Sequence, residues 1–282
     1  MKRIILAAGG IILLFTLLVF GKTSVPKPTM TFPGRTLPVY NVESAIARYK
    51  QGLTPSQVVY LSKIENGITR GDLKKQSSEQ LGALADFWKD SAKKFVPYAY
   101  YLSQAAKLDN SEKSLTFAAR LILQNLKTED STGIKTWEAT TAADLFTRAL
   151  KLDPNNDDLK VDLGSCYIYG QGMAGDPMQT MKGIQELLQV VSKDSNNMRA
   201  QLVLGIGGVI SNQLDKAIVR LNKVVSFDPT NLEAVSWLAD AYAAKGDKVN
   251  AAKWYEQAKK LVNNPNFSKE VDQRIKELNE AP

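Results

Sequence analysis

Three short phrases at the ends of expected helices constrain the fold of this chain most. They read Asp153-Pro154-Asn155-Asn156, Asp194-Ser195-Asn196-Asn197 and Asp228-Pro229-Thr230-Asn231, and they are spaced by 41 and then 34 residues. A turn that recurs between amphipathic helices at such intervals is typical of repeat proteins, in which each helix pair buries its apolar face on its neighbours. The spacing therefore predicts an all-α chain of stacked helix-turn-helix units.

Large and small residues also recur at fixed places within these units. The last two units carry Leu238, Ala239, Tyr242, Ala251, Tyr255, Ala258 and Leu261, and Leu204, Gly205, Ala217, Leu221, Val224, Asp228 and Pro229; the earlier ones carry Leu163, Gly164, Tyr167, Leu187, Val190 and Asp194, and Ala142, Phe146, Ala149, Leu152, Asp153 and Pro154. This pattern resembles the tetratricopeptide repeat (TPR) over about Glu79 to Val262. The resemblance implies a right-handed α-solenoid whose usual activity is to hold another polypeptide.

Two units are longer than the family's 34 residues. The unit that closes at Asp153 begins after Asp109, 44 residues earlier, so we expect a loop from Asn125 to Lys135. The unit that closes at Asp194 connects its helices through the segment from Tyr167 to Asp176, which is similar to the extended Sel1-like variant.

The same connection contains a G-x-G-x-x-G sequence at Gly170, Gly172 and Gly175. A dinucleotide-binding turn follows a β-strand within a βαβ unit, whereas a helix is expected before this one. We therefore interpret the glycines as part of a helix connection and expect no bound cofactor.

The first 21 residues predict a membrane anchor. Lys2 and Arg3 precede an apolar run from Ile4 to Phe20, whose 17 residues would rise about 25 Å as a helix, near the lower limit for crossing a bilayer. A cleaved signal peptide is the alternative. Because long downstream domains are exported largely regardless of charge, we expect a single-pass protein of the inner (cytoplasmic) membrane with its C-terminal domain on the periplasmic side; a cytoplasmic body remains the alternative.

The rest of the chain divides by composition. Residues 22–41 contain Pro26, Pro28, Pro33 and Pro38 and predict an extended stalk. We expect short membrane-proximal helices over residues 42–76, one from about Val42 to Gln51 and a second that starts at Thr54 with a capping box to Gln57. TPR-like repeats over 77–262 and a C-terminal capping helix over 263–282 should follow. From Lys22 to Gln76 there are nine Lys or Arg against three acidic residues, whereas the part from Ser77 to the end has 25 against 26. The neutral body disfavours nucleic acid as a partner, and attraction to anionic head groups stays open for the basic membrane-proximal part.

Catalysis is not expected. The chain has no histidine and one cysteine, Cys166, so catalytic triads, Cys-His pairs and the usual zinc sites are excluded. Cys166 occupies a small buried position of the repeat, which indicates a core residue. We predict no catalytic residue, no metal site and no cofactor; an enzyme or a glycan-processing regulator is the alternative of a different class.

In TPR arrays the first helix of each pair lines a concave groove. Transferred to this register, the resemblance implies that the groove residues are Phe117, Leu121, Val161, Ile168, Tyr169, Leu202, Ile206, Val209, Ile210 and Trp237. Most of these side chains are apolar, and only Asn125 and Arg199 fit a groove that grips a charged C-terminus. We therefore expect a groove for an apolar or amphipathic segment of a partner protein, unless the protein fills the groove itself.

The sequence thus favours a membrane-anchored TPR scaffold. A chaperone-like accessory subunit of a secretion or cytochrome-maturation assembly is a more specific alternative. The oligomeric state stays open.

Overall fold

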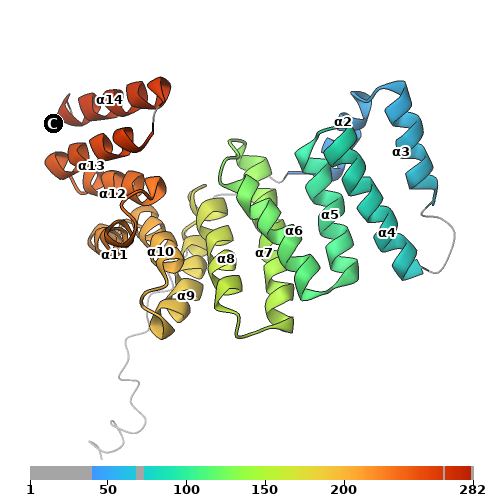
Figure 1. The fold of residues 1–282 in the computed structure, drawn as a ribbon, viewed down its shortest axis with the longest axis horizontal. Helices are drawn as coiled ribbons and strands as arrows, with labels where there is room; N and C mark the ends of the chain where they lie inside the picture. Colours follow the sequence, from blue (N-terminus) through green and yellow to red (C-terminus); the bar gives the residue numbers. More distant parts are fainter. Residues whose placement is uncertain (1–39, 68–72, 263, 281–282) are drawn as a thin grey trace, which may run out of the picture. The chain divides into compact units, whose positions relative to one another are not determined.

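The computed structural model describes residues 40–67, 73–262 and 264–280, and the elements found there are all helical. In chain order (Figure 1) they are α2 (Val42–Gln51), α3 (Pro55–Gly67), α4 (Leu73–Asp86), the π-helix η1 (Phe87–Ser91), α5 (Phe95–Asp109), α6 (Glu112–Leu126), α7 (Thr132–Leu152), α8 (Asp157–Tyr167), the π-helix η2 (Ile168–Gly172), α9 (Pro177–Lys193), α10 (Met198–Ile210), α11 (Leu214–Phe227), α12 (Leu232–Ala244), α13 (Lys248–Leu261) and α14 (Pro265–Glu280). The expected anchor at 1–21 and nearly all of the expected stalk lie outside the described residues. Within these residues, no helix combines the length and the hydropathy that a membrane crossing requires.

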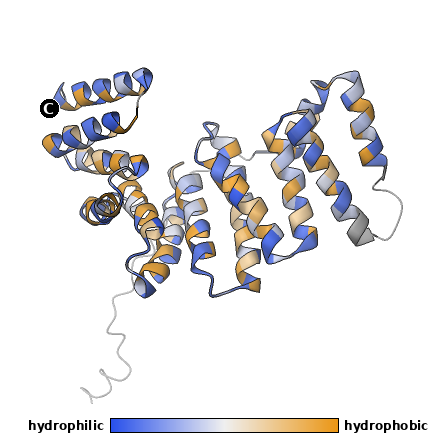
Figure 2. Cartoon of the chain, in the orientation of Figure 1, coloured by the Kyte–Doolittle hydropathy of each residue, from blue (hydrophilic) through white to orange (hydrophobic). Residues whose placement is uncertain are grey.

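Helices that follow one another in the chain pack side by side. The pairs are α4 with α5, α6 with α7, α8 with α9, α10 with α11 and α12 with α13, and α14 packs on α13. We call α4, α6, α8, α10 and α12 the first helices and their partners the second helices. Hydrophobic and hydrophilic residues alternate around them (Figure 2), as expected for elements that bury one face. The expectation of an all-α helical repeat is confirmed.

The recurrent turn phrases join two helix caps. Asp153, Asp194 and Asp228 follow the last residue of a second helix, and the asparagine three positions later begins the next first helix. The Oδ1 atoms of Asn156, Asn197 and Asn231 accept hydrogen bonds of 3.1, 3.0 and 2.9 Å from backbone amides three residues on. Each asparagine thereby satisfies an amide that the helix leaves without a partner, which explains why the phrase recurs.

Two glycines allow the helices of a pair to approach closely. A Cβ atom on Gly164 would lie 2.7 Å from Cγ of Leu187, and one on Gly205 would lie 2.6 Å from Cγ of Leu221. Both leucines are completely buried. The Leu-Gly element of the repeat pattern is thus a packing requirement between first and second helix.

The N-terminal helices confirm several local predictions. α2 covers the expected range, and α3 starts with the expected capping box, in which Thr54 N donates to Oε1 of Gln57 (3.0 Å) and Gln57 N donates to Oγ1 of Thr54 (3.4 Å). Trp88 is completely buried at the centre of the cluster that these helices form with α4 and α5. α4 begins at Leu73, ahead of the expected boundary at residue 77.

Two connections differ from expectation or refine it. The loop expected from Asn125 to Lys135 is present but shorter, because α6 continues to Leu126 and α7 starts at Thr132. Most of the extra residues lengthen α7 to 21 residues. The extended connection after α8 is the π-helix η2 followed by a turn in which Gly175 has a φ of 90°.

Candidate functional site

The first helices form a continuous face from α6 to α12. Contacts join α6 to α8, α8 to α10 and α10 to α12. Between α4 and α6 the described residues make no contact of comparable extent. The first-helix face, by which we mean the side of α6, α8, α10 and α12 directed away from the second helices, is therefore closely packed in its later part and open beside α6.

Four of the ten predicted groove residues are buried. Val161 and Tyr169 have exposed fractions of 1% and 2%, and Ile168 and Ile206 are completely covered. All four belong to the large core between α5 and α10. The expectation that they offer a free surface is wrong, because the first helices pack on one another at these positions and η2 folds back onto the core.

The other six positions are more accessible. Leu121, Leu202, Val209, Ile210 and Trp237 are half-buried and pack against the edges of the buried clusters. Phe117 alone among the ten is strongly exposed, at 58%. The part of the predicted set that can meet a ligand is therefore found chiefly on α6, around Phe117 and Leu121.

A cluster of three residues, Lys127, Tyr169 and Glu233, covers the buried part of the first-helix face. The hydroxyl group of Tyr169 donates to Oε1 of Glu233 at 2.5 Å, and Nζ of Lys127 lies 3.4 Å from Oε2 of the same carboxylate and 4.4 Å from the ring centre of Tyr169. Burial and the adjacent Glu233 raise the pKa of Tyr169. These residues come from the end of α6, from η2 and from the start of α12, so the protein fills this part of the predicted groove itself.

A second polar bridge crosses the same face nearer to α6. Asp162 on α8 is 2% exposed, and its carboxylate accepts from Nε of Arg120 at 2.7 Å and from Nη2 of Arg199. Arg199 also bonds to Asp158 at 2.9 Å. Asn125 donates to Glu138 at 2.7 Å. Both residues that suited a carboxylate clamp are thus bonded to the protein's own acids.

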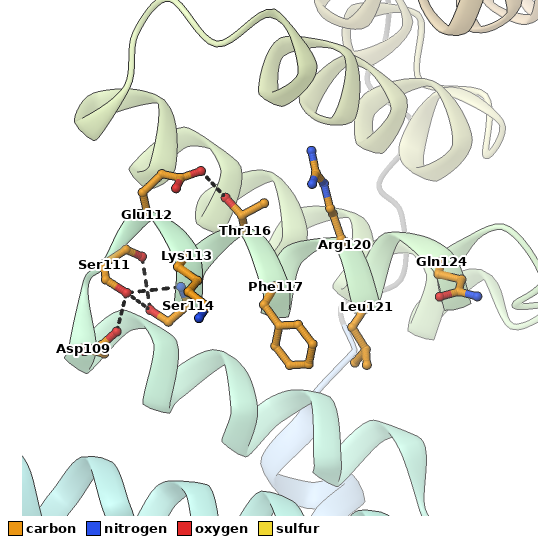
Figure 3. A pocket seen from close by; sticks show the side chains of 10 residues that line it. All are labelled: Asp109, Ser111, Glu112, Lys113, Ser114, Thr116, Phe117, Arg120, Leu121 and Gln124. Carbon is orange, nitrogen blue, oxygen red and sulfur yellow. Dashed lines mark hydrogen bonds between the residues drawn. The ribbon is translucent and has the colours of Figure 1, made fainter.

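The open part of the face contains a groove of about 750 Å³, which we call the α6 groove. It is lined by Asp109, Ser111, Glu112, Lys113, Ser114, Thr116, Phe117, Arg120, Leu121 and Gln124. In Figure 3, Phe117 and Leu121 project to one side of α6 and Arg120 to the other. The polar residues at the start of α6 bond among themselves, for example Ser111 to Asp109 at 2.6 Å. The groove therefore combines an apolar wall with a half-exposed guanidinium group.

Reactive chemistry is not evident in the described part of the chain. No cluster of potential metal ligands occurs there. Cys166 is completely buried, and burial raises the pKa of its thiol well above the ordinary value, which is the opposite of an activated nucleophile. Gly170 of the G-x-G-x-x-G sequence follows a helix, and a Cβ atom there would lie 2.2 Å from Cβ of Ala139. The first two glycines of that sequence serve packing within the repeat.

Sequence reasoning also missed a buried acid on α7. Glu138 on α7 is completely covered, its Oε2 atom has no hydrogen-bond partner, and burial raises the pKa of its carboxyl group to about 8. It lies below the protein surface and is no part of the α6 groove, so we assign it no role in binding. Its place inside a helix of ordinary amphipathic pattern gave no signal of this environment.

The stacked helix pairs, their common turn and their Leu-Gly contacts define the chain as a TPR-like helical repeat protein. No protein-family model matches the chain, and no curated protein matches it. Among solved structures it is similar to "MamA 41-end" from Desulfovibrio magneticus RS-1, with 20% identity over 67% of this chain and 96% of that one and a TM-score of 0.48. It is also similar to YrrB, described as a TPR protein with an unusual peptide-binding site, with 17% identity, coverages of 71% and 92% and a TM-score of 0.46.

Proposed function

We propose that the protein is a binding scaffold that holds a segment of another polypeptide in the α6 groove. The observation that carries this proposal is the exposed Phe117 beside Leu121 in a groove of about 750 Å³ on the first-helix face. A segment with an apolar side chain would cover both residues and gain the free energy of removing them from water. Arg120 stands at the opposite side of α6, where its Nε atom is paired with Asp162, and its half-exposed guanidinium group can also meet a polar group of the same segment.

The occupant we propose is an apolar or amphipathic segment of a partner protein. Charges along the groove oppose one another, since Lys113 and Arg120 stand against Asp109 and Glu112. Net charge therefore gives little selectivity, and the apolar contact decides affinity. Exposed anchors of this kind, once covered by a partner, dominate binding free energies at interfaces.

The test uses in-cell photocrosslinking from position 117, with position 249 as the control. Val249 is also apolar and is 80% exposed, but it lies on α13, outside the α6 groove. We expect a protein adduct from position 117 and none from position 249. With the purified adduct partner, Phe117→Asp should weaken binding by about 2 kcal/mol or more, about thirtyfold in Kd, while Val249→Asp leaves it unchanged. Equal adducts from both positions, or adducts only with the protein's own chain, would contradict the proposal.

We further propose that residues 1–21 anchor the scaffold in the cytoplasmic membrane and that the repeats lie on the periplasmic side. The apolar run from Ile4 to Phe20 behind Lys2 and Arg3 supports this topology. Protease added to intact spheroplasts should then digest the repeats, and the protein should stay with the membrane after a carbonate wash. Protection from the protease, or release of a shortened chain, would contradict it.

A further inference from the structure

In the last three helix pairs, charge is divided between the first and the second helices. The second helices α9, α11 and α13 carry two, three and four Lys or Arg, with one acidic residue each. The first helices α8, α10 and α12 carry one, one and none, against three, none and two acidic residues. In these three pairs the second helices are thus basic although the repeat region as a whole is nearly neutral.

Two grooves flank α11 on this basic side. The first, about 470 Å³, lies between α10 and α11 and is lined by Gln201, Asp215, Lys216, Val219, Arg220 and Lys223. The second, about 450 Å³, is lined by residues of α11, the following turn and α13, among them Lys253, Trp254 and Lys260. We call the two grooves together the α11 surface.

The cations of the first groove have neutral partners. Nζ of Lys216 donates to Oε1 of Gln213 at 3.1 Å, Nη1 of Arg220 donates to Oε1 of Gln201 at 2.7 Å, and Nζ of Lys223 donates to the carbonyl oxygen of Ser195 at 2.6 Å. Within the described residues none of the three forms an ion pair, so their charges are oriented but not neutralised. This is the arrangement expected of a site for an anionic group.

A buried side chain positions the central cation. Gln201 is only 6% exposed, and its Nε2 atom donates to the Ser195 carbonyl oxygen at 2.8 Å while its Oε1 atom holds Arg220. Burial lowers the pKa of Arg220, although the guanidinium group stays charged. The one acid of the groove, Asp215, is paired with Lys245 at 2.6 Å.

Apolar side chains stand between the cations. Val219 is 70% exposed within the first groove, and Trp254 lies in the second, with Nζ of Lys253 at 5.7 Å from its ring. Phe227, 73% exposed, ends α11. Apolar and basic groups thus lie beside one another on α11 and α13.

We propose that the α11 surface binds an acidic amphipathic segment of a partner polypeptide. Carboxylates of the segment would pair with Lys216, Arg220 and Lys223, and its apolar side chains would cover Val219 and Trp254. A half-buried guanidinium group in a groove can be reached by a narrow peptide side chain but poorly by a flat bilayer. Nucleic acid is a poorer fit, because the cations are confined to two short grooves and the repeat region as a whole lacks the net positive charge that attracts phosphate backbones. This surface is distinct from the α6 groove.

The test measures binding of the full-length protein to a labelled peptide by fluorescence anisotropy. The peptide has 14 residues, as α11 does, with Glu and Leu at helical spacing, and a second peptide has Gln in place of Glu. We expect the Glu peptide to bind more tightly than the Gln peptide and to lose affinity as salt is added. The triple variant Lys216→Gln, Arg220→Gln, Lys223→Gln should weaken binding at least about tenfold.

The matched control changes the same charge elsewhere, in Lys63→Gln, Lys151→Gln, Lys182→Gln, and should bind the Glu peptide as the unmodified protein does. A second variant, Val219→Glu, keeps the test valid if the triple variant misfolds, because this exposed position tolerates a polar side chain. Val219→Glu should also bind the Glu peptide less tightly. Phe117→Asp should have no effect. The proposal would be overturned if both peptides bound equally or if the control variant lost as much affinity as the triple variant. It would also be overturned if the protein preferred vesicles of anionic lipid or single-stranded RNA, or if it formed a dimer that the triple substitution converts to monomers.

Discussion

At the scale of single residues, burial decides what a polar side chain does in this protein. Glu138 keeps one hydrogen bond, from Asn125, and leaves Oε2 without a partner in an apolar interior. Since its pKa is about 8 against 4.5 for an ordinary glutamate, the folded protein holds the proton to higher pH than the unfolded chain does. The stability contributed by the neutral carboxyl group is complete below about pH 4.5 and is lost as the pH rises to about 8.

The substitution Glu138→Gln should remove this dependence. Its oxygen can still accept from Asn125, and its amide carries no charge to bury. We expect the variant to gain stability over the unmodified protein as the pH rises from 5 to 8, by a few kcal/mol at most, because each tenfold change in proton affinity corresponds to about 1.4 kcal/mol. Urea unfolding at several pH values measures this. A difference that stays constant over the range would contradict the assigned burial.

The role of a single residue could be predicted from the sequence where it depends on neighbouring residues in the chain. Asn156, Asn197 and Asn231 cap the helices that their turn phrases predicted, and the Thr54 and Gln57 capping box forms as expected. The burial of Glu138 could not be predicted, because it depends on the packing of α7 against neighbouring helices and not on the residues beside Glu138 in the chain.

At the scale of helices, the distance between the two members of a pair is set by glycine. Gly205 faces Leu221, and an added methyl group would have to displace this buried leucine. We expect Gly205→Ala to lower the free energy of unfolding by about 1–3 kcal/mol, the usual cost of overfilling a packed core. Thermal or urea denaturation checks the value.

Gly82 on α4 provides the matched control. A Cβ atom there would meet nothing within 4 Å, so Gly82→Ala should stabilise the protein by about 0.5–1 kcal/mol through helix propensity. If both substitutions shift stability in the same direction, the close contact between α10 and α11 does not limit packing.

The helices themselves were predictable because their turns and their large and small positions recur. The length of the loop between α6 and α7 could not be predicted, because the number of additional residues does not show whether they lengthen a loop or a helix. The segment that begins at Thr132 has few helix breakers, and its packing against α6 and η2 favours the longer helix.

At the scale of the whole repeat region, the Tyr169 cluster joins residues that are far apart in sequence. Lys127 and Glu233 are 106 positions apart, yet they meet at 3.4 Å, and Tyr169 lies 64 positions before Glu233. Repeat arrays otherwise depend on contacts between neighbours, so this cluster should raise the cooperativity of unfolding.

We expect Tyr169→Phe to cost about 1.5–3 kcal/mol, because it removes a hydrogen bond to a charged group and leaves the ring in place. Hydrogen exchange should then accelerate at the end of α6 and at the start of α12 together. The control Lys276→Gln breaks an exposed pair of 3.8 Å with Glu280 and should change stability by less than about 0.5 kcal/mol. Faster exchange at only one of the two helices would show that the cluster does not couple them.

The predicted ligand surface was only partly right, because contacts between helices that are distant in sequence cover some of its residues. Ile206 and Tyr169 occupy positions that face outward in an open repeat array, but contacts between first helices cover them. Phe117 stays accessible because α4 does not close over α6. The α11 surface escaped notice because the total charge of the repeat region is close to zero and hides the three cations, Lys216, Arg220 and Lys223, that α11 brings together.

Cys166 has a practical consequence for measuring how this protein moves. It is the only cysteine, and it is fully enclosed with a thiol that resists ionisation. A cysteine placed at an exposed position such as 117 or 219 would therefore be the single fast-reacting thiol on the chain. Spectroscopic labels can then be attached without first removing the native sulfur, so either groove can be monitored by a site-specific probe while the interior keeps its natural packing.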